Sequence, residues 1–464
     1  MFSSQTYIER RNILKARLKS GIALFMGNEE SSMNYADNTY HFRQDSTFLY
    51  YFGLNHAGLT GVIDLDEGKD FIFGNDITVE DIVWMGYLPS IAMQAKDAGV
   101  ENTGSAADLD SFITEAHKKG RKIHILPPYR PENKIKLLDW FGIPLDDTWE
   151  AASVEFIKGV IAQREIKSQE ELDEIEKAVN TSVDMHVAAM QMVRPGMSES
   201  VIAARVQEIA VREGGNIAFP IIATKNGETL HNHYHGNMLN EGDMLLLDAG
   251  AETAMGYAGD LSSTMPVSDA FTERQKGIYN ISLASHEASI AMMKPGIPFK
   301  DVYFESNRII MEGMRDLGIV KGDTEEALHL GVHAMFFPCG LGHQMGLDVH
   351  DMEDLGEVYV GYDGKAKSTQ FGIKSLRLAK PLKPGLVLTI EPGIYFIPAL
   401  IDMWKSEKQF TDFINYDKLE AYKGFGGIRN EENFVITEDG YKLIGKPKPK
   451  TVEDVEKQKN LAST

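Results

Sequence analysis

The residues best suited to chemistry are two aspartates, Asp248 and Asp260, in the stretch DAGAETAMGYAGD. Asp248 directly follows four apolar residues at 244–247, so we expect it at the end of a buried strand. An isolated carboxylate there is costly unless a cation neutralises it, and a divalent metal ion is the simplest neutraliser. The alternative is that each aspartate only caps a turn or the following segment.

Three more polar residues stand in apolar or glycine-rich surroundings further along the chain. Glu391 interrupts the apolar segment 386–396, and Glu431 interrupts 424–437; both segments are predicted to be β-strands. An unpaired carboxylate buried in a strand would be costly, although Glu431 could also sit at a hairpin end and pair with its neighbour Arg429. His343 lies between two glycines that let the backbone approach another group closely.

Four carboxylates and one imidazole could therefore form a single site. Two divalent ions would balance four carboxylates, activate a water molecule and polarise a carbonyl group for attack. Oxygen-dominated ligation with a single histidine favours Mn²⁺, with Co²⁺, Fe²⁺ or Zn²⁺ as possible substitutes. The five candidate ligands are Asp248, Asp260, His343, Glu391 and Glu431.

The elements that must position these residues require more than one domain. A chain of 464 residues exceeds one ordinary core, and its composition shifts around residues 149–167, so we predict domains at 1–165 and 166–464. The first alternates short apolar runs with helical stretches, which indicates a mixed α/β domain with a central sheet. Its aromatic segment 42–55 is interpreted as core and turn.

The second domain contains an internal repeat. A capping box at Ser168 predicts the start of a long helix that ends before residue 195, and a second helix is predicted from Ser198. Six residues recur with a displacement of 100, which predicts two related halves. The two histidines of the repeat, His186 and His286, lie in predicted amphipathic helices and are interpreted as structural residues rather than metal ligands. The first set is Ser182, His186, Ala188, Met192, Pro195 and Gly196, and the second is Ser282, His286, Ala288, Met292, Pro295 and Gly296.

Three histidines alternate in the segment 231–237, HNHYHGN. In a strand they would point to one side and could bind a metal ion, whereas a solvated loop explains the composition equally well. One of them could still contact a substrate.

Charge and cysteine content restrict the partners and the compartment. The net charge of −21 argues against nucleic acid or an anionic membrane as a partner. The N-terminal stretch becomes charged before any apolar run long enough for a signal peptide, and no later run reaches membrane-spanning length. Cys339 is the one cysteine, so an intramolecular disulfide and a cysteine-rich zinc site are excluded. We therefore expect a cytoplasmic protein.

The ordered motifs DAG…GD, GLGH…GLDVHD, TIEPGIY and GIRNEE resemble those of the pita-bread-fold metallopeptidases, specifically aminopeptidase P and prolidase. The resemblance covers nearly the whole chain. FRQDSTFLYYFGLN resembles the N-terminal domain of aminopeptidase P, whereas EPGIYFIP and the insertion before GFGGIR look more like prolidase. The resemblance implies an α+β protein in which a mixed α/β domain precedes a pita-bread (creatinase/aminopeptidase-like) domain with an internal pseudo-twofold.

The resemblance also assigns metal-binding roles. It implies that Asp248 chelates one ion, that His343 and Glu391 hold the other, and that Asp260 and Glu431 bridge both. One extra residue separates Asp248 from Asp260 relative to the usual family spacing. We expect the turn at 253–255 to absorb it.

Substrate-side roles are implied for five residues. His231 and His350 match histidines that contact the substrate, Arg429 matches the arginine that orients it around the proline, and Glu391 matches the residue that shuttles a proton to the leaving group. Cys339 stands where relatives commonly carry a histidine near the proline-binding pocket. We therefore expect this departure to affect substrate preference rather than the metal site.

The expected activity is that of an Xaa-Pro aminopeptidase acting on small peptides with proline in the second position, with prolidase as the alternative. A metal-free hydrolase resembling creatinase, or a binding protein of the same fold, would have lost ligand residues, and all five are present. Relatives with this kind of N-terminal domain form dimers or tetramers. A homodimer or homotetramer is therefore expected.

Overall fold

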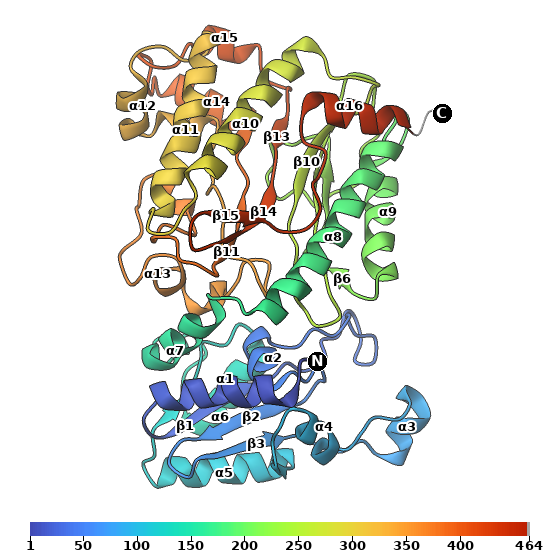
Figure 1. The fold of residues 1–464 in the computed structure, drawn as a ribbon, viewed down its shortest axis with the longest axis vertical. Coiled ribbons are helices and arrows are strands. Elements are labelled where there is room, and N and C mark those ends of the chain that lie inside the picture. Colours follow the sequence, from blue (N-terminus) through green and yellow to red (C-terminus); the bar gives the residue numbers. More distant parts are fainter. Residues whose placement is uncertain (462–464) are drawn as a thin grey trace. The chain divides into compact units, whose positions relative to one another are not determined.

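The computed structural model describes residues 1–461, which form two compact units (Figure 1). Unit 1 comprises Met1–Arg164 and Met352–Tyr359, and unit 2 comprises Glu165–Asp351 and residues from 360 onward. Within the described range, none of the helices combines the length and the apolar character needed to cross a membrane.

Unit 1 is built on a five-stranded mixed sheet with the order β4-β3-β2-β1-β5. β1 pairs antiparallel with β2 and parallel with β5, while β3 pairs antiparallel with β2 and parallel with β4. A mixed α/β domain with a central sheet is therefore confirmed. The strands are β1 (Ile22–Met26), β2 (Thr60–Asp64), β3 (Lys69–Phe73), β4 (Asn102–Gly104) and β5 (Ile123–His124). The helices are α1 (Ser4–Arg17), α2 (Ser46–Phe52), α3 (Val79–Met85), α4 (Ile91–Asp97), α5 (Ala106–Lys118), α6 (Pro131–Phe141) and α7 (Val154–Arg164).

The aromatic segment 42–55 is core, as predicted, but its centre is the helix α2 rather than a turn. Asp45 caps this helix by accepting a hydrogen bond from the Phe48 backbone N–H at 2.8 Å. Gly53 ends it with a φ of 69°, a left-handed conformation that glycine adopts without a steric penalty. Every residue of α2 is buried, so its aromatic side chains serve the core of unit 1.

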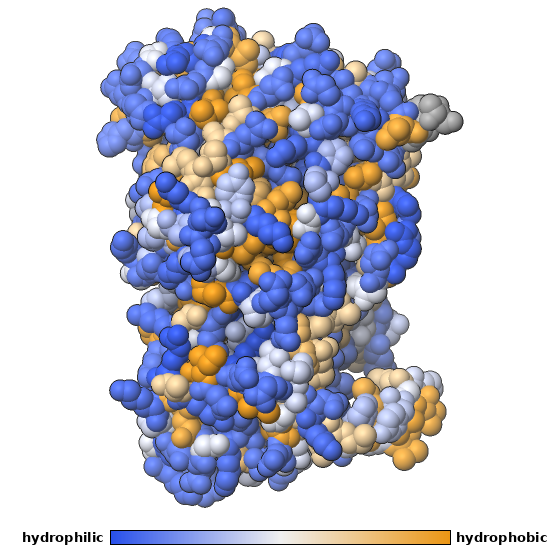
Figure 2. Space-filling model, in the orientation of Figure 1, coloured by the Kyte–Doolittle hydropathy of each residue, from blue (hydrophilic) through white to orange (hydrophobic). Residues whose placement is uncertain are grey.

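The short helix α3 has no buried residue. Thr78 and Asp81 form a capping box at its start, so the helix is locally stabilised although it stands off the sheet of its unit (Figure 1). The apolar side chains are strongly exposed, 75% for Val83 and 81% for Trp84, and the surface over α3 is visibly hydrophobic (Figure 2). We call this patch the α3 surface; it comprises Val79, Val83, Trp84, Met85 and Tyr87.

Unit 2 consists of two related halves (Figure 1). One half contains the antiparallel sheet β10-β8-β7, and the other contains the antiparallel sheet β11-β14-β15. The strands are β7 (Ile222–Thr224), β8 (Met244–Asp248), β10 (Ser262–Pro266), β11 (Val387–Ile390), β14 (Glu432–Ile436) and β15 (Tyr441–Leu443). Two-stranded pairs join β6 (Asn216–Ile217) to β9 (Ala251–Glu252) and β12 (Gly393–Tyr395) to β13 (Gly427–Arg429).

Each half also has a helix pair with the same connection. Ser168 caps the first long helix with a capping box, and Ser198 stands at the N-cap of the second, as predicted. Gly196 and Gly296 both have a φ of 87°, and each donates its N–H at 2.8 Å to a leucine carbonyl, of Leu239 and Leu382 respectively. This correspondence confirms the predicted internal repeat. The pairs are α8 (Gln169–Met192) with α9 (Glu199–Arg212), and α10 (Glu273–Met292) with α11 (Phe299–Asp316). The shorter helices of unit 2 are α12 (Thr324–Leu330), α14 (Pro398–Ser406), α15 (Tyr416–Glu420) and α16 (Val452–Leu461), whereas α13 (Glu357–Val360) belongs to unit 1 except for its last residue.

The segments 386–396 and 424–437 form β-strands with an interruption at each glutamate, as predicted, but the chain changes sheets at each interruption. Each segment is two strands that belong to different sheets: β11 pairs with β14, and β12 pairs with β13. Glu391 occupies the break in the first segment, where the following proline has no N–H to continue a ladder. Glu431 occupies the break in the second segment. Both carboxylates therefore lie where the chain changes sheets.

Candidate metal centre

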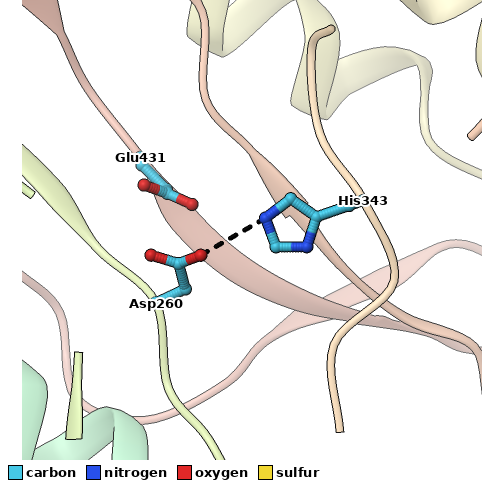
Figure 3. A group of neighbouring side chains, drawn as sticks. All are labelled: Asp260, His343 and Glu431. Carbon is cyan, nitrogen blue, oxygen red and sulfur yellow. Dashed lines mark ion pairs between the residues drawn. The ribbon is translucent and has the colours of Figure 1, made fainter. Parts of the chain in front are cut away.

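One pocket in unit 2 is lined by all five residues that the sequence singled out as metal ligands. Its volume is about 240 Å³. Three of the five, Asp260, His343 and Glu431, each place one potential ligand atom within 4.8 Å of the others, and their side chains point toward one another (Figure 3). The five lining residues are Asp248, Asp260, His343, Glu391 and Glu431.

Strand ends and sheet changes position the carboxylates. Asp248 is the last residue of β8, as expected from the apolar run before it. Asp260 follows a turn and is held by its backbone, because its N–H donates to Asn433 Oδ1 at 3.1 Å and its carbonyl accepts from Asn433 Nδ2 at 2.5 Å. This double hydrogen bond fixes the Asp260 backbone while leaving its carboxylate to face the pocket.

His343 is oriented in the way that suits a metal ligand. Its Nδ1 lies 3.0 Å from the Gln344 carbonyl, an acceptor to which it donates when it carries the ring proton. The other nitrogen, Nε2, lies 3.2 Å from Asp260 Oδ2 and 3.5 Å from Glu391 Oε1. A histidine that binds metal characteristically donates its second ring N–H to a backbone carbonyl in this way.

Three of the pocket carboxylates each have one oxygen without a hydrogen-bond donor. Among the described residues, Asp248 Oδ1, Asp260 Oδ1 and Glu431 Oε1 are buried without a hydrogen-bond partner. Burial, assisted by the charge of Asp248, raises the pKa of Asp260 to about 8, and burial also raises the pKa of Glu391 and Glu431. Without cations, these groups cannot all be ionised near neutral pH. Oxygen donors with one imidazole fit divalent metal ions.

Arg429 forms its ion pair with Asp248, so the interpretation that it pairs with Glu431 is wrong. Its Nη2 lies 2.5 Å from Asp248 Oδ2, while Nε and Nη1 donate to Ser262 Oγ and Tyr395 Oη, each at 2.8 Å. Glu431 follows the end of β13 and instead accepts a hydrogen bond from Ser262 Oγ at 2.8 Å. The guanidinium group is buried, and its three polar nitrogens all have partners in the protein.

The other residues expected to face a substrate line the same pocket. The rings of His350 and His343 are in edge contact, with centroids 4.3 Å apart. Burial, together with the charge of Arg429, lowers the pKa of His231, so its ring is neutral near pH 7. Burial raises the pKa of Cys339 to about 12, which keeps this residue a thiol. The pocket thus combines His231, Cys339 and His350 with the candidate ligands.

The three alternating histidines at 231–237 are in a loop, so the strand alternative is wrong. His231 and His233 line the pocket, whereas His235 Nε2 lies 2.9 Å from the Ile221 carbonyl and ties the loop to its own half of unit 2. The echoed His186 is buried scaffold, as predicted, and its ring nitrogens contact Ser263 Oγ at 2.9 Å and the Ala249 carbonyl at 3.0 Å. His286 is also buried.

Sequence reasoning missed Arg377, Ser375 and Phe219, which also line the pocket. Arg377 stands in the stretch KSLRLAK, where a cation at every third position looks like an ordinary exposed segment. Only the fold brings this guanidinium to the metal centre.

Comparison with known proteins identifies the class. Residues 173–438 match the metallopeptidase family M24, and residues 7–125 match the aminopeptidase P N-terminal domain. The protein is therefore a metallopeptidase, a metal-dependent hydrolase of peptide bonds. It belongs to metallopeptidase family M24.

Similar proteins cover almost the entire chain. Human Xaa-Pro dipeptidase is 30% identical over 97% of this chain and 91% of its own length. A variant of Escherichia coli aminopeptidase P in complex with substrate matches with a TM-score of 0.82 and 28% identity, over 100% of this chain and 99% of that one. Zinc-substituted E. coli aminopeptidase P in complex with product matches with a TM-score of 0.80 and 26% identity, over 99% of both chains. The predicted resemblance and the predicted pita-bread fold class are confirmed.

Proposed function

We propose that this protein is an Xaa-Pro aminopeptidase that uses two divalent metal ions to hydrolyse the bond between an N-terminal residue and a proline. The convergence of four carboxylates and His343 in one pocket carries this proposal. The similarity to aminopeptidase P and to Xaa-Pro dipeptidase supports the choice of substrate. Small peptides with proline in the second position are the proposed substrates.

The proposed ligand set is Asp248, Asp260, His343, Glu391 and Glu431. A bridging role for Asp260 and Glu431 agrees with their closeness to His343 and with the carboxylate oxygen that each leaves without a donor. Mn²⁺ is the proposed metal because oxygen donors dominate, and the zinc-substituted relative supports Zn²⁺ as a substitute. When bound, such ions supply Lewis acidity and positive charge near the scissile carbonyl group.

The chain's own residues would bind the peptide and move its protons. Burial raises the pKa of Glu391, so this carboxyl group can accept a proton and return it to the leaving nitrogen. We propose that the neutral imidazole of His231 and the ring of His350, which both line the pocket, hydrogen-bond the substrate. Orientation of the substrate by Arg429 stays a prediction, since its three polar nitrogens already contact Asp248, Ser262 and Tyr395.

One feature of the pocket favours prolidase activity, namely a second guanidinium group. A dipeptide ends in a carboxylate directly after the proline, and recognition of this group requires a cation. Arg377 adds a second guanidinium group to the pocket. Dipeptidase activity is therefore the second candidate function.

A peptide panel separates the two candidates. Xaa-Pro dipeptides, Xaa-Pro-Yaa tripeptides and matched Xaa-Ala peptides are assayed with Mn²⁺, and kcat/KM is compared. We expect both proline series to be cleaved, with the tripeptides preferred. A preference for dipeptides would establish prolidase instead, and equal cleavage of the Xaa-Ala controls would contradict proline specificity.

Cys339 should weaken the preference for proline. Its side chain is smaller than an imidazole and lies in the pocket with Glu391, so the space beside the substrate is larger. We expect Cys339→His to raise the ratio of kcat/KM for Xaa-Pro over Xaa-Ala peptides by about 10- to 100-fold, since a pocket contact shifts specificity by about 1–3 kcal/mol. An unchanged ratio in a stable, metal-loaded variant would show that Cys339 only packs behind the adjacent turn.

The α3 surface supports the expected assembly into a homodimer or homotetramer. Trp84 is 81% exposed, and a large exposed aromatic side chain is a frequent centre of binding energy in interfaces. We expect Trp84→Ser to weaken self-association about 30-fold or more, corresponding to about 2 kcal/mol. Sedimentation across a concentration series measures the effect. Val211→Ser, at another exposed apolar residue, is the control, and equal behaviour of the two variants would exclude the α3 surface.

Three further expectations stay predictions. The single cysteine favours a reducing, cytoplasmic location. The net charge of −21 disfavours nucleic acid and anionic membranes as partners.

A further inference from the structure

Lys448 places a buried ammonium group behind the metal centre. It lies between β15 and α16, beyond the residues 173–438 that match the family, and it is only 5% exposed. Its Nζ donates to the Ser262 carbonyl at 2.8 Å and to Ser263 Oγ at 2.9 Å. Both acceptors are neutral, so Lys448 is held by hydrogen bonds to β10 and not by an ion pair with them.

Ser262 connects Lys448 to the carboxylates. The Ser262 carbonyl also accepts the Glu431 backbone N–H at 3.2 Å, and Ser262 Oγ donates to Glu431 Oε2 at 2.8 Å. The same hydroxyl accepts from Arg429 Nε, and Ser262 is paired with Asp248 in the β8–β10 ladder. Displacement of Ser262 would therefore move Glu431 and disturb the strand that ends at Asp248.

Ser263 connects Lys448 to the other side of Asp248. An ammonium group only donates, so Ser263 Oγ accepts from Lys448. The Ala249 carbonyl, 3.0 Å from His186 Nε2, can only accept, so Nε2 carries the ring proton of the neutral imidazole. His186 Nδ1 is then an acceptor, and Ser263 Oγ donates its proton to it across 2.9 Å. Burial, assisted by the charge of Lys448, lowers the pKa of His186 to about 3, in agreement with this neutral ring.

We infer that Lys448 is a positioning residue of the metal centre, which fixes Glu431 through Ser262 and the chain after Asp248 through Ser263 and His186. This inference rests on the proposed metal-dependent function. The positive charge of Lys448 would by itself oppose the binding of cations, whereas its hydrogen bonds would favour binding by holding the ligands in place. The two effects have opposite signs, so metal affinity distinguishes them.

Lys448→Met keeps a side chain of similar size but removes the charge and the hydrogen bonds. Lys448→Gln also removes the charge but retains an amide that can donate to the Ser262 carbonyl and to Ser263 Oγ. The matched control is Lys446→Met, because Lys446 lies in the same segment but is exposed and pairs with Asp184 at 2.5 Å. Dissociation constants for Mn²⁺ are measured by calorimetry on metal-free protein, with thermal unfolding alongside. We expect Lys448→Met to bind Mn²⁺ about 10- to 100-fold more weakly, Lys448→Gln to recover most of the loss, and Lys446→Met to match the wild type.

Any other pattern of Mn²⁺ affinities contradicts the inference. Unchanged Mn²⁺ affinity in Lys448→Met with lowered thermal stability would make Lys448 only structural, and tighter binding would show that its charge dominates. If Lys448→Met does not fold, Ser263→Ala interrupts the connection to His186 alone and should also weaken Mn²⁺ binding; unchanged affinity there would again overturn the inference. A wild-type protein that binds no divalent ion would contradict the proposed function itself. A wild-type protein that binds Mn²⁺, together with variants that bind it equally well, would contradict only the role of Lys448.

Discussion

Asp260→Asn should lower kcat/KM at least about 1,000-fold, which is about 4 kcal/mol of transition-state stabilisation, while the protein remains folded. Asp260 Oδ2 lies 3.2 Å from His343 Nε2, and its second oxygen has no donor, which supports the proposal that this carboxylate holds the metal ions. An amide is neutral and a much poorer metal ligand. Steady-state kinetics on Xaa-Pro peptides with added Mn²⁺ measure the loss.

The fold should survive this change because the hydrogen bonds to Asn433 involve the Asp260 backbone. The pKa of Asp260 is raised from its ordinary 3.8 to about 8 in the folded protein. Between about pH 4 and pH 8 the unfolded chain therefore carries this carboxyl group ionised while the metal-free folded protein holds it protonated, so the free energy of unfolding falls as the pH rises through this range. Asparagine removes that cost. We expect metal-free Asp260→Asn to melt at pH 8 no lower than the wild type.

Glu431→Gln is a matched second variant, because its amide oxygen can still accept the Ser262 hydroxyl. Wild-type kinetics in a folded Asp260→Asn protein would show that the metal site has been assigned to the wrong residues.

His350→Ala should lower kcat about 100-fold without releasing metal, since a positioned acid or base contributes about 10²–10⁴-fold. His350 contacts the ring of His343 from its edge and is proposed to face the substrate. His231→Ala, in the loop that borders the same pocket, should also reduce kcat and retain metal. Metal stoichiometry measured beside kinetics tests both variants.

His343→Ala is the control for this experiment, because Nε2 of His343 is a proposed ligand atom and its removal should lower metal content. A loss of metal in His350→Ala or His231→Ala that parallels the loss of activity would make that histidine a ligand. The ligand set would then have to be redrawn.

The sequence could predict three of the four carboxylates because each ends or interrupts an apolar run. Asp248 ends a strand, and Glu391 and Glu431 lie within β-forming segments, whereas Asp260 follows a glycine-rich turn and is identified only together with the others. The change of sheet at Glu391 and Glu431 could not be predicted, because it depends on which distant strand offers a partner. For the same reason Arg429 pairs with Asp248 across the fold rather than with its sequence neighbour.

Residues without a local pattern escaped prediction. Arg377 and Lys448 lie in lysine-rich stretches that read as solvated surface, yet one lines the pocket and the other is buried behind it. The alternating histidines at 231–237 matched strand periodicity, but their loop is held by contacts such as that of His235 with the Ile221 carbonyl. The α3 helix has a clear capping box, but its exposure depends on packing that no local signal encodes.

The two-stranded pair β12–β13 has a consequence for protein engineering. Gly393 pairs with Arg429 and Tyr395 with Gly427, so Glu391 precedes this ribbon by the same two residues by which Glu431 follows it. The pairing of β12 with β13 therefore sets the spacing of the two carboxylates. The connection 396–426, which contains α14 and α15, does not set this spacing through its length. Loop closure costs only about 0.6 kcal/mol for each doubling in length. A foreign domain or a binding tag grafted at the exposed residues 405–408 of this connection should therefore leave the spacing of the two carboxylates unchanged.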